Sequence, residues 1–211
     1  MSDERQTANN IGQAMGAKGQ RTRRRIIDAT VTLLATTSLR DARVAEIARL
    51  AEISPASFYV YFDSVHDVVL AAIAEIDQSP ATLLDMLAQP WPASEARSRA
   101  RAFVRSYIEF WQDHRVVFRV RNLASEEGDE RFRVLRENSI RPLLGAMAAR
   151  IEAEDSTHSD VPGYAQAGVV AAMLERISAI YGSYKDSELV TSAQLIEAAA
   201  LVVADRLGAR P

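Results

Sequence analysis

The stretch VAEIARLAEISPASFYVYF, residues Val44–Phe62, decides the fold of the N-terminal part of the chain. Its first half carries apolar residues at helical spacing on one face, namely Val44, Ile47, Ala48 and Ala51. A second helix follows, because the Ser54 hydroxyl can cap its first turn and Pro55 suits the first helical position, where a missing N–H costs nothing. The stretch therefore predicts two short helices joined by a tight turn.

The second of these helices has two different faces. Its inward face consists of Phe58, Tyr61 and Phe62. Its outward face consists of Ala56, Ser57, Tyr59 and Val60. Two short helices that meet across such a turn form the unit that places its second helix in the major groove of DNA. The sequence therefore predicts a DNA-binding regulator.

The composition is that of a globular protein without disulfides. The 211 residues are 48% apolar and 25% charged, and the absence of cysteine excludes disulfides and thiolate metal sites. No apolar run approaches the ~18–20 residues of a membrane span, and the N-terminus lacks the apolar core of a signal peptide. These features predict a cytoplasmic protein.

The charge is unevenly distributed along the chain. The net charge is −3, yet residues 18–49 contain eight basic and three acidic side chains and carry a local charge of +5. A basic N-terminal part on an acidic remainder is typical of a phosphate-binding module joined to a domain that does not bind DNA. Arg21 to Arg25, taken alone, are equally compatible with a solvated charged face of a helix.

The apolar periodicity predicts an all-α protein with roughly nine helices, and strand-type alternation competes nowhere. Residues 1–17 lack periodicity and are predicted to be a disordered tail. The predicted helices begin near Gly19, and the last two span about 164–181 and 187–207. The helix over 65–76 has the length of a strut between the basic N-terminal part and the rest.

The motif residues also resemble a family, the TetR family of one-component bacterial repressors. The positions that match its helix-turn-helix motif directly are Ile47, Ala48, Ala51, Ser54, Tyr59, Tyr61, Phe62 and Ser64. The resemblance is specific over residues 20–75 and extends to helix count and rough helix lengths beyond them. It implies a helix-turn-helix DNA-binding domain over 18–63, and ligand binding and homodimerisation over 64–211.

Two positions depart from the family pattern. Glu52 stands in the turn where the family usually has glycine, so the turn must differ slightly or accept left-handed strain. Val65 replaces a lysine that in the family typically contacts a phosphate. The loss of that contact predicts weaker DNA binding with a salt slope lower by about 1.

The expected DNA contacts fall into two groups. Contacts to the phosphate backbone are expected from Arg21, Arg23, Arg24 and Arg43 and, by the resemblance, from the hydroxyls of Tyr59 and Tyr61. Contacts within the groove are expected from the start of the second helix and its outward face, at Ser54, Pro55, Ala56, Ser57 and Val60. Tyr61 is equally compatible with core packing. Because this helix has no Arg, Lys, Asn or Gln, specificity should depend on thymine methyls and DNA shape.

Aromatic residues and methionines in the later helices are candidates for an effector pocket. The residues are Phe103, Tyr107, Phe110, Trp111, Phe118, Asn122, Met147, Met173, Arg176 and Tyr181. An apolar cavity with a few polar groups is the usual composition of a small-molecule site, although such a stripe is also typical of plain core. A mostly apolar effector is expected, with a polar or anionic group near Asn122 or Arg176, unless Arg176 pairs with a carboxylate or faces solvent.

The last two helices are rich in small residues, which let helices approach closely. In the family two such helices from each chain form a four-helix dimer interface, and the alternative is packing within one chain. A ligand that favours the wrong spacing of two DNA-binding heads on a palindrome would release the operator.

Two other functions are less well supported by the residues. An enzyme is not indicated, because the three histidines are far apart, no glycine-rich phosphate loop occurs, and EEGDE at 126–130 lacks the alternating ligands of a calcium loop. No cofactor or metal is expected. The alternatives to a ligand-released repressor are a DNA-binding protein of this fold controlled by a protein partner, and a ligand carrier that has lost DNA binding.

Overall fold

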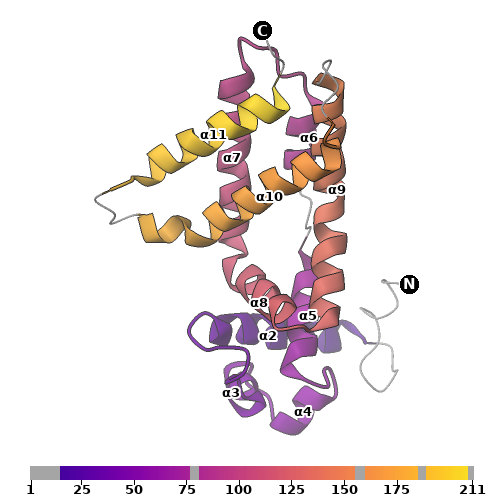
Figure 1. The fold of residues 1–211 in the computed structure, drawn as a ribbon. Helices are drawn as coiled ribbons and strands as arrows, with labels where there is room; N and C mark the ends of the chain where they lie inside the picture. The colour runs from indigo at the N-terminus through magenta and orange to yellow at the C-terminus, as the bar shows by residue number, and fades with distance from the viewer. Residues whose placement is uncertain (1–14, 77–80, 155–159, 185–188, 209–211) are drawn as a thin grey trace. The chain divides into compact units, whose positions relative to one another are not determined.

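The computed structural model describes residues 15–76, 81–154, 160–184 and 189–208. Over these residues it contains ten α-helices, one short 3-10 helix and no strand (Figure 1). The all-α class is confirmed, and ten helices agree closely with the nine expected. None of the helices in these ranges combines the length and the apolar composition that crossing a membrane requires.

The chain divides into two compact units. The first unit comprises Met1–Ile76 and Val116–Arg133, and the second comprises Asp77–Arg115 and Val134–Pro211. The first contains α2 (Ala17–Leu34), α3 (Val44–Leu50), α4 (Pro55–Tyr59), α5 (Val65–Glu75), most of α8 (Arg115–Glu126) and the start of α9 (Glu130–Glu154). The second contains α6 (Ala81–Ala88), α7 (Ala96–Asp113), the rest of α9, α10 (Gly163–Ile180), the 3-10 helix η1 (Tyr181–Tyr184) and α11 (Ser192–Leu207).

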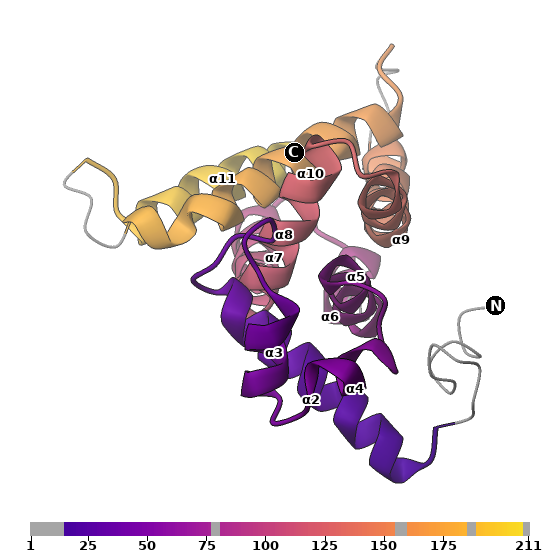
Figure 2. The ribbon, with the colours of Figure 1, turned by 90° about the horizontal axis from the view of Figure 1, so that it is seen from below.

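The core of the first unit forms where α2 packs on both α3 and α5. Figure 2 shows α3 and α4 beside α2. The fully or almost fully buried side chains include Ile26, Ile27, Leu34, Ile47, Phe58, Phe62, Val68, Val69 and Ile73. They recur at helical spacing, so each helix presents one apolar stripe to its neighbours. This packing holds the short α3 and α4, which are below the length at which isolated helices are stable.

Two helix starts differ from the sequence expectation, and capping explains one of them. The last helix was expected from Ser187, which lies outside the described residues, but α11 begins at Ser192. Thr191 and Gln194 form a capping box: Gln194 N–H donates to Thr191 Oγ1 (3.2 Å), and Thr191 N–H donates to Gln194 Oε1 (2.9 Å). At the other end of the chain, α2 begins at Ala17, two residues earlier than expected, and residues 1–14 of the predicted tail lie outside the described part.

The turn between α3 and α4 places Glu52 in a left-handed conformation, with φ of 51°. It is the one non-glycine residue with positive φ among those the structure describes. Of the two alternatives for this turn, the structure therefore shows left-handed strain, at a cost of about 1–2 kcal/mol for a residue with a Cβ. Arg25 partly offsets the strain by donating to Glu52 Oε2 (2.9 Å) and to the Ala51 carbonyl.

Glu52→Gly is expected to raise the free energy of unfolding by about 0.5–1 kcal/mol, because relief of left-handed strain outweighs the loss of an exposed ion pair. Glu52→Ala is the matched control, since it removes the same ion pair and keeps the Cβ. Chemical denaturation of both variants measures the difference. A glycine variant no more stable than the alanine variant would contradict the strain assignment.

In the second unit, α7 packs against both α10 and α11 (Figure 1). The Arg101 guanidinium on α7 pairs with both oxygens of Glu197 on α11 (Nη2–Oε2 2.9 Å), and Gln112 Nε2 donates to the Ser178 carbonyl of α10 (2.5 Å). At the start of α10, a Cβ on Gly163 would lie 2.9 Å from the Ala148 carbonyl oxygen. Only glycine therefore permits this close approach of α10 to α9.

Arg150 of α9 is buried and donates hydrogen bonds to three backbone carbonyls of the second unit. Its Nε donates to the Leu207 carbonyl (2.6 Å), and its Nη1 donates to the carbonyls of Leu87 (3.1 Å) and Gln89 (2.6 Å). Its guanidinium carbon lies 4.9 Å from the ring centroid of Trp91. One side chain thus satisfies the last carbonyl groups of α6 and α11. Burial lowers the pKa of Arg150, but the guanidinium remains charged.

Candidate functional site

The helix-turn-helix is formed by α3, the turn 51–54 and α4. Ser54 caps α4 as expected: its Oγ accepts from Ser57 N–H (3.1 Å) and lies 2.8 Å from Ser57 Oγ. Phe58 is fully buried, with its ring centroid 5.5 Å from that of Tyr59 and 6.1 Å from that of Phe62. The buried Phe58 ring therefore fixes which face of α4 points outward.

The outward face of α4 agrees with the expectation. Ser54, Pro55, Ala56, Tyr59 and Val60 are exposed, and Ser57 is half-buried. Tyr59 keeps 53% of its surface exposed, a large value for an aromatic residue. Tyr61 is half-buried. Its hydroxyl lies near the first turn of α2, because a Cβ built at Gly19 would be 3.9 Å from the hydroxyl oxygen. This exposed face carries no charged side chain.

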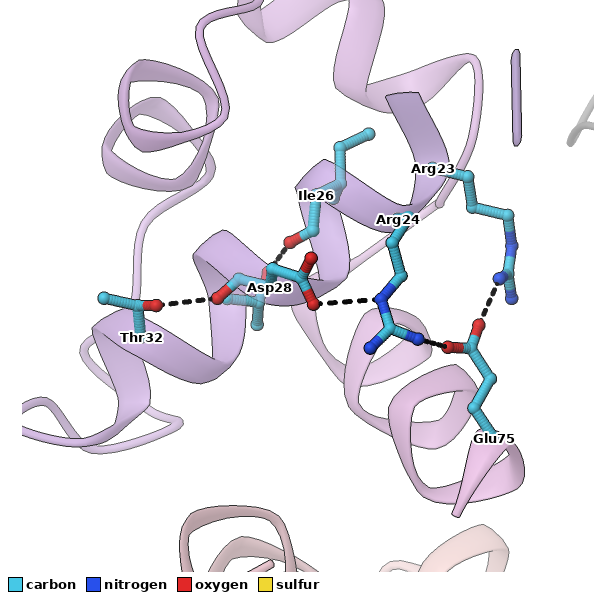
Figure 3. A network of polar contacts seen from close by, with 7 residues as sticks. Arg23, Arg24, Ile26, Asp28, Thr32 and Glu75 are labelled. Atoms are coloured by element: carbon cyan, nitrogen blue, oxygen red, sulfur yellow. Dashed lines mark hydrogen bonds and ion pairs between the residues drawn. The ribbon is translucent and has the colours of Figure 1, made fainter. Parts of the chain in front are cut away.

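Several arginines of α2 are engaged within the first unit. Arg23 is largely buried, pairs with Glu75 of α5 (2.6 Å), and has its guanidinium carbon 5.3 Å from the Phe62 ring centroid. Arg24 is exposed and pairs with Glu75 (2.8 Å) and Asp28 (3.1 Å), as Figure 3 shows. The positive charge of residues 18–49 is therefore partly neutralised by Glu75, which is distant from them in sequence.

Other cations of this unit remain available. Arg21 and Arg43 are exposed, and Arg43 is the residue before α3, with Nη1 3.5 Å from the Arg40 carbonyl. Within the described ranges, no acidic group lies within ion-pair distance of Lys18, Arg21, Arg40 or Arg49. Sequence reasoning did not select Lys18, Arg40 and Arg49 as contact residues, because the sequence does not reveal which arginines are paired.

The predicted effector residues are divided between the two units. Phe103, Tyr107 and Trp111 lie on one buried face of α7, and Phe103 packs on Trp91, with ring centroids 6.0 Å apart. The others in the second unit are the half-buried Phe110, the buried Met147, the half-buried Met173 and Tyr181, and the exposed Arg176. Phe118 and Asn122 belong to α8 in the first unit.

Arg121 of α8 is a buried cation that sequence reasoning missed. It is 6% exposed, its guanidinium carbon lies 4.6 Å from the Phe118 ring centroid, and its Nε donates to Asn122 Oδ1 (3.0 Å). Arg121 and Asn122 thus form a hydrogen-bonded polar pair beside the Phe118 ring. Asn122 is thus part of a cluster whose charge comes from its sequence neighbour.

A cavity of about 560 Å³ lies in the second unit between α7, η1 and the first turns of α11. Ile108, Ile196 and Tyr181 provide apolar lining, and Glu109 and Asp113 provide negative charge. Tyr181 is among the residues that line this cavity, and the other nine predicted effector residues are not. A smaller cavity of about 270 Å³ in the first unit lies between the end of α2 and α8, where Arg119 donates to the Leu34 carbonyl (2.7 Å).

Two family models match the chain. The model of tetR-family bacterial regulatory proteins matches residues 26–72, and the model of the tetracyclin repressor-like C-terminal domain matches residues 83–208. The chain belongs to the TetR family of transcriptional regulators. The match over 26–72 covers the helix-turn-helix described above. None of the curated proteins matches the sequence.

Solved structures of TetR-like fold resemble the chain along most of its length. FadR, the fatty acid degradation regulator of Bacillus halodurans, is 16% identical, with a TM-score of 0.63, and the match covers 94% of this chain and 100% of that one. The MbdR regulator of Azoarcus sp. CIB is 17% identical, with a TM-score of 0.65 and coverage of 88% and 98%. FadR of Bacillus subtilis, in complex with stearoyl-CoA, is 12% identical, with a TM-score of 0.63 and coverage of 89% and 99%.

The position of the missing family lysine has a structural role in this TetR-family chain. Val65, the first residue of α5, is 8% exposed and belongs to the core of the first unit. Ser64 caps the same helix by accepting from Asp67 N–H (3.2 Å). The position at which the family pattern has a lysine is therefore occupied here by a side chain that packs inward.

Proposed function

We propose that the protein binds a palindromic operator as a dimer through α4 and that a small, mostly apolar effector releases it from DNA. The observation that supports the proposal is the exposed face of α4, together with cations of the same unit for which the described residues provide no acidic partner. In this proposal residues 18–63 read DNA and residues 64–211 bind the effector and form the dimer. Repression follows if the operator overlaps a promoter.

On the DNA side, Arg21 and Arg43 contact phosphates, with Lys18, Arg40 and Arg49 as additional donors. Arg23 and Arg24 hold Glu75 in the free protein, so a phosphate competes with that carboxylate for them. Pro55, Ala56 and Val60 contact thymine methyls, and Ser57 contacts a base or phosphate. The hydroxyls of Tyr59 and Tyr61 complete the phosphate contacts.

The dimer forms through the outward faces of α10 and α11. Tyr164 and Val169 on α10, and Leu201 and Val202 on α11, are 45–71% exposed. The small residues on the same helices divide between two faces: Ala167, Ala171, Ala199 and Ala200 are buried within the chain, whereas Ala165, Ala172, Ala193 and Ala198 are exposed. An exposed apolar face with small residues is typical of a symmetric helix–helix interface.

The effector enters the second unit at the cavity between α7, η1 and α11, where Tyr181 is one of the lining residues. The buried aromatic and methionine side chains of α7 and α9 contact it only if this cavity extends inward on binding. Because FadR of Bacillus subtilis was solved with stearoyl-CoA, fatty acyl-CoA esters are the first compounds to test. An effector releases DNA only to the extent that it binds the DNA-incompatible state more tightly than the DNA-compatible one.

The deciding experiment measures binding of the purified protein to the DNA flanking its own gene at several salt concentrations, with and without acyl-CoA esters. Two-fold symmetric protection that is lost on adding an ester supports the proposal. Protection that no small molecule alters would favour control by a protein partner. Absence of site-specific binding would point to other operators or to a ligand carrier.

Arg21→Ala and Val60→Ala are expected to weaken DNA binding in different ways. Loss of the Arg21 phosphate contact lowers affinity on all sequences and reduces the salt slope by about 1. Loss of the Val60 methyl contact leaves the slope unchanged and costs about 1 kcal/mol at particular base pairs. Fluorescence anisotropy on operator and mutated duplexes distinguishes the two effects. A slope change for Val60→Ala would contradict its assignment to the groove.

A further inference from the structure

Glu75, the last residue of α5, holds two arginines of α2 with one carboxylate (Figure 3). Its Oε1 lies 2.6 Å from Arg23 Nη1, and its Oε2 lies 2.8 Å from Arg24 Nη1. The Nε of Arg24 donates to Asp28 Oδ1 at 3.1 Å. These two guanidinium groups and two carboxylates have zero net charge, so the four side chains offer DNA no net positive charge while the pairs persist.

The two arginines are held with different strength. The side chain of Arg23 is 15% exposed and lies over the Phe62 ring, so its position is fixed by packing as well as by charge. The side chain of Arg24 is 63% exposed. Ion pairs of such exposed side chains contribute little to stability, so another anion can replace the carboxylate at Arg24.

These arginines also lie close to the DNA-reading helix. The Arg23 guanidinium lies over the ring of Phe62, which is the third residue after the end of α4. One turn before Arg23 on α2 is Gly19, and a Cβ built at Gly19 would lie 3.9 Å from the Tyr61 hydroxyl. Arg24 is therefore on the part of α2 that borders the end of the helix-turn-helix.

We propose that Glu75 substitutes for a DNA phosphate in the free protein: it occupies Arg24, and a backbone phosphate displaces it when DNA binds. Arg23 stays on Phe62 and keeps the Glu75 carboxylate in place. Each DNA complex must then break the Arg24–Glu75 pair, which lowers affinity for any sequence and makes weak, non-specific complexes less favourable. The inference rests on the proposed DNA-binding function.

The first test compares Glu75→Gln with Asp28→Asn in the full-length protein. Both variants remove one negative charge that contacts Arg24, but only the first releases it from α5. Binding to a random-sequence duplex is measured by fluorescence anisotropy at several salt concentrations. Glu75→Gln is expected to bind about 5-fold more tightly than wild type, and Asp28→Asn less than about 2-fold more tightly. An E75Q affinity no higher than that of D28N would overturn the proposal.

Because Glu75 also pairs with Arg23, Glu75→Gln can destabilise the first unit. A second variant, at Arg24, leaves the Arg23–Glu75 pair intact. Arg24→Gln in the wild-type background is expected to lower the salt slope by about 1, because Arg24 neutralises a phosphate in the complex. An unchanged slope would mean that Arg24 only braces α2 against α5, and would overturn the proposal. Wild-type protein that binds no DNA at any salt concentration would overturn the proposed function as well, which separates the two failures.

Discussion

Replacing Arg150 by methionine is expected to lower the free energy of unfolding by about 3 kcal/mol, because several buried hydrogen-bond acceptors lose their donor together. The carbonyls of Leu87, Gln89 and Leu207 all accept from this guanidinium. Methionine retains length and helix propensity, so the packing over Trp91 is partly preserved. The loss therefore reports mainly on the carbonyl groups and the cation–π contact.

The matched control is Arg99→Met. Arg99 is a more exposed arginine of the same unit that pairs with Glu95 one turn away (2.8 Å). Its replacement is expected to cost less than about 1 kcal/mol. Urea denaturation followed by circular dichroism measures both variants. Equal losses for the two variants would show that Arg150 has no special structural role.

Replacing Val169 by glutamate is expected to weaken dimerisation by about 100-fold or more, because the symmetric interface proposed for α10 and α11 would bury the new charge twice. Val169 is 71% exposed in the single chain, so the substitution should leave the fold of the second unit intact. Only one DNA-binding domain could then bind the proposed palindromic operator at a time, and the affinity of the protein for that operator should fall by about 10²–10⁴-fold.

Sedimentation velocity over a range of concentrations, followed by operator binding, measures this effect. Val134→Glu is the control, since Val134 is 41% exposed on α9 and lies outside the proposed interface. The control should remain as dimeric as wild type. A V169E variant that stays dimeric would place the interface on another surface.

The helix-turn-helix could be predicted from sequence because its signals are local. The cap at Ser54, the proline at position 55 and the spacing of Phe58 and Phe62 act within a few residues of each other, and the structure places them as expected. At Glu52 the sequence left two alternatives, a slightly different turn or left-handed strain, and the structure shows the second.

The ionic partners could not be predicted, because they connect residues far apart in the chain. Arg23 and Glu75 are separated by 52 positions, and Arg150 and Leu87 by 63. The sequence showed a basic segment, but only the packing of α2 on α5 determined that Arg23 and Arg24 pair with Glu75, whereas the described residues place no carboxylate at Arg21. The buried Arg121 was missed for the same reason, as its burial depends on the elements around α8.

The all-α class, the helix-turn-helix and the family followed from the sequence alone, since each depends on periodicity, capping and turn chemistry within short windows. The tertiary structure was needed to show which of the described charges are paired, which aromatic residues serve as core and which apolar faces of α10 and α11 are exposed in the single chain. These properties depend on burial, and burial is set by long-range packing that no local pattern encodes.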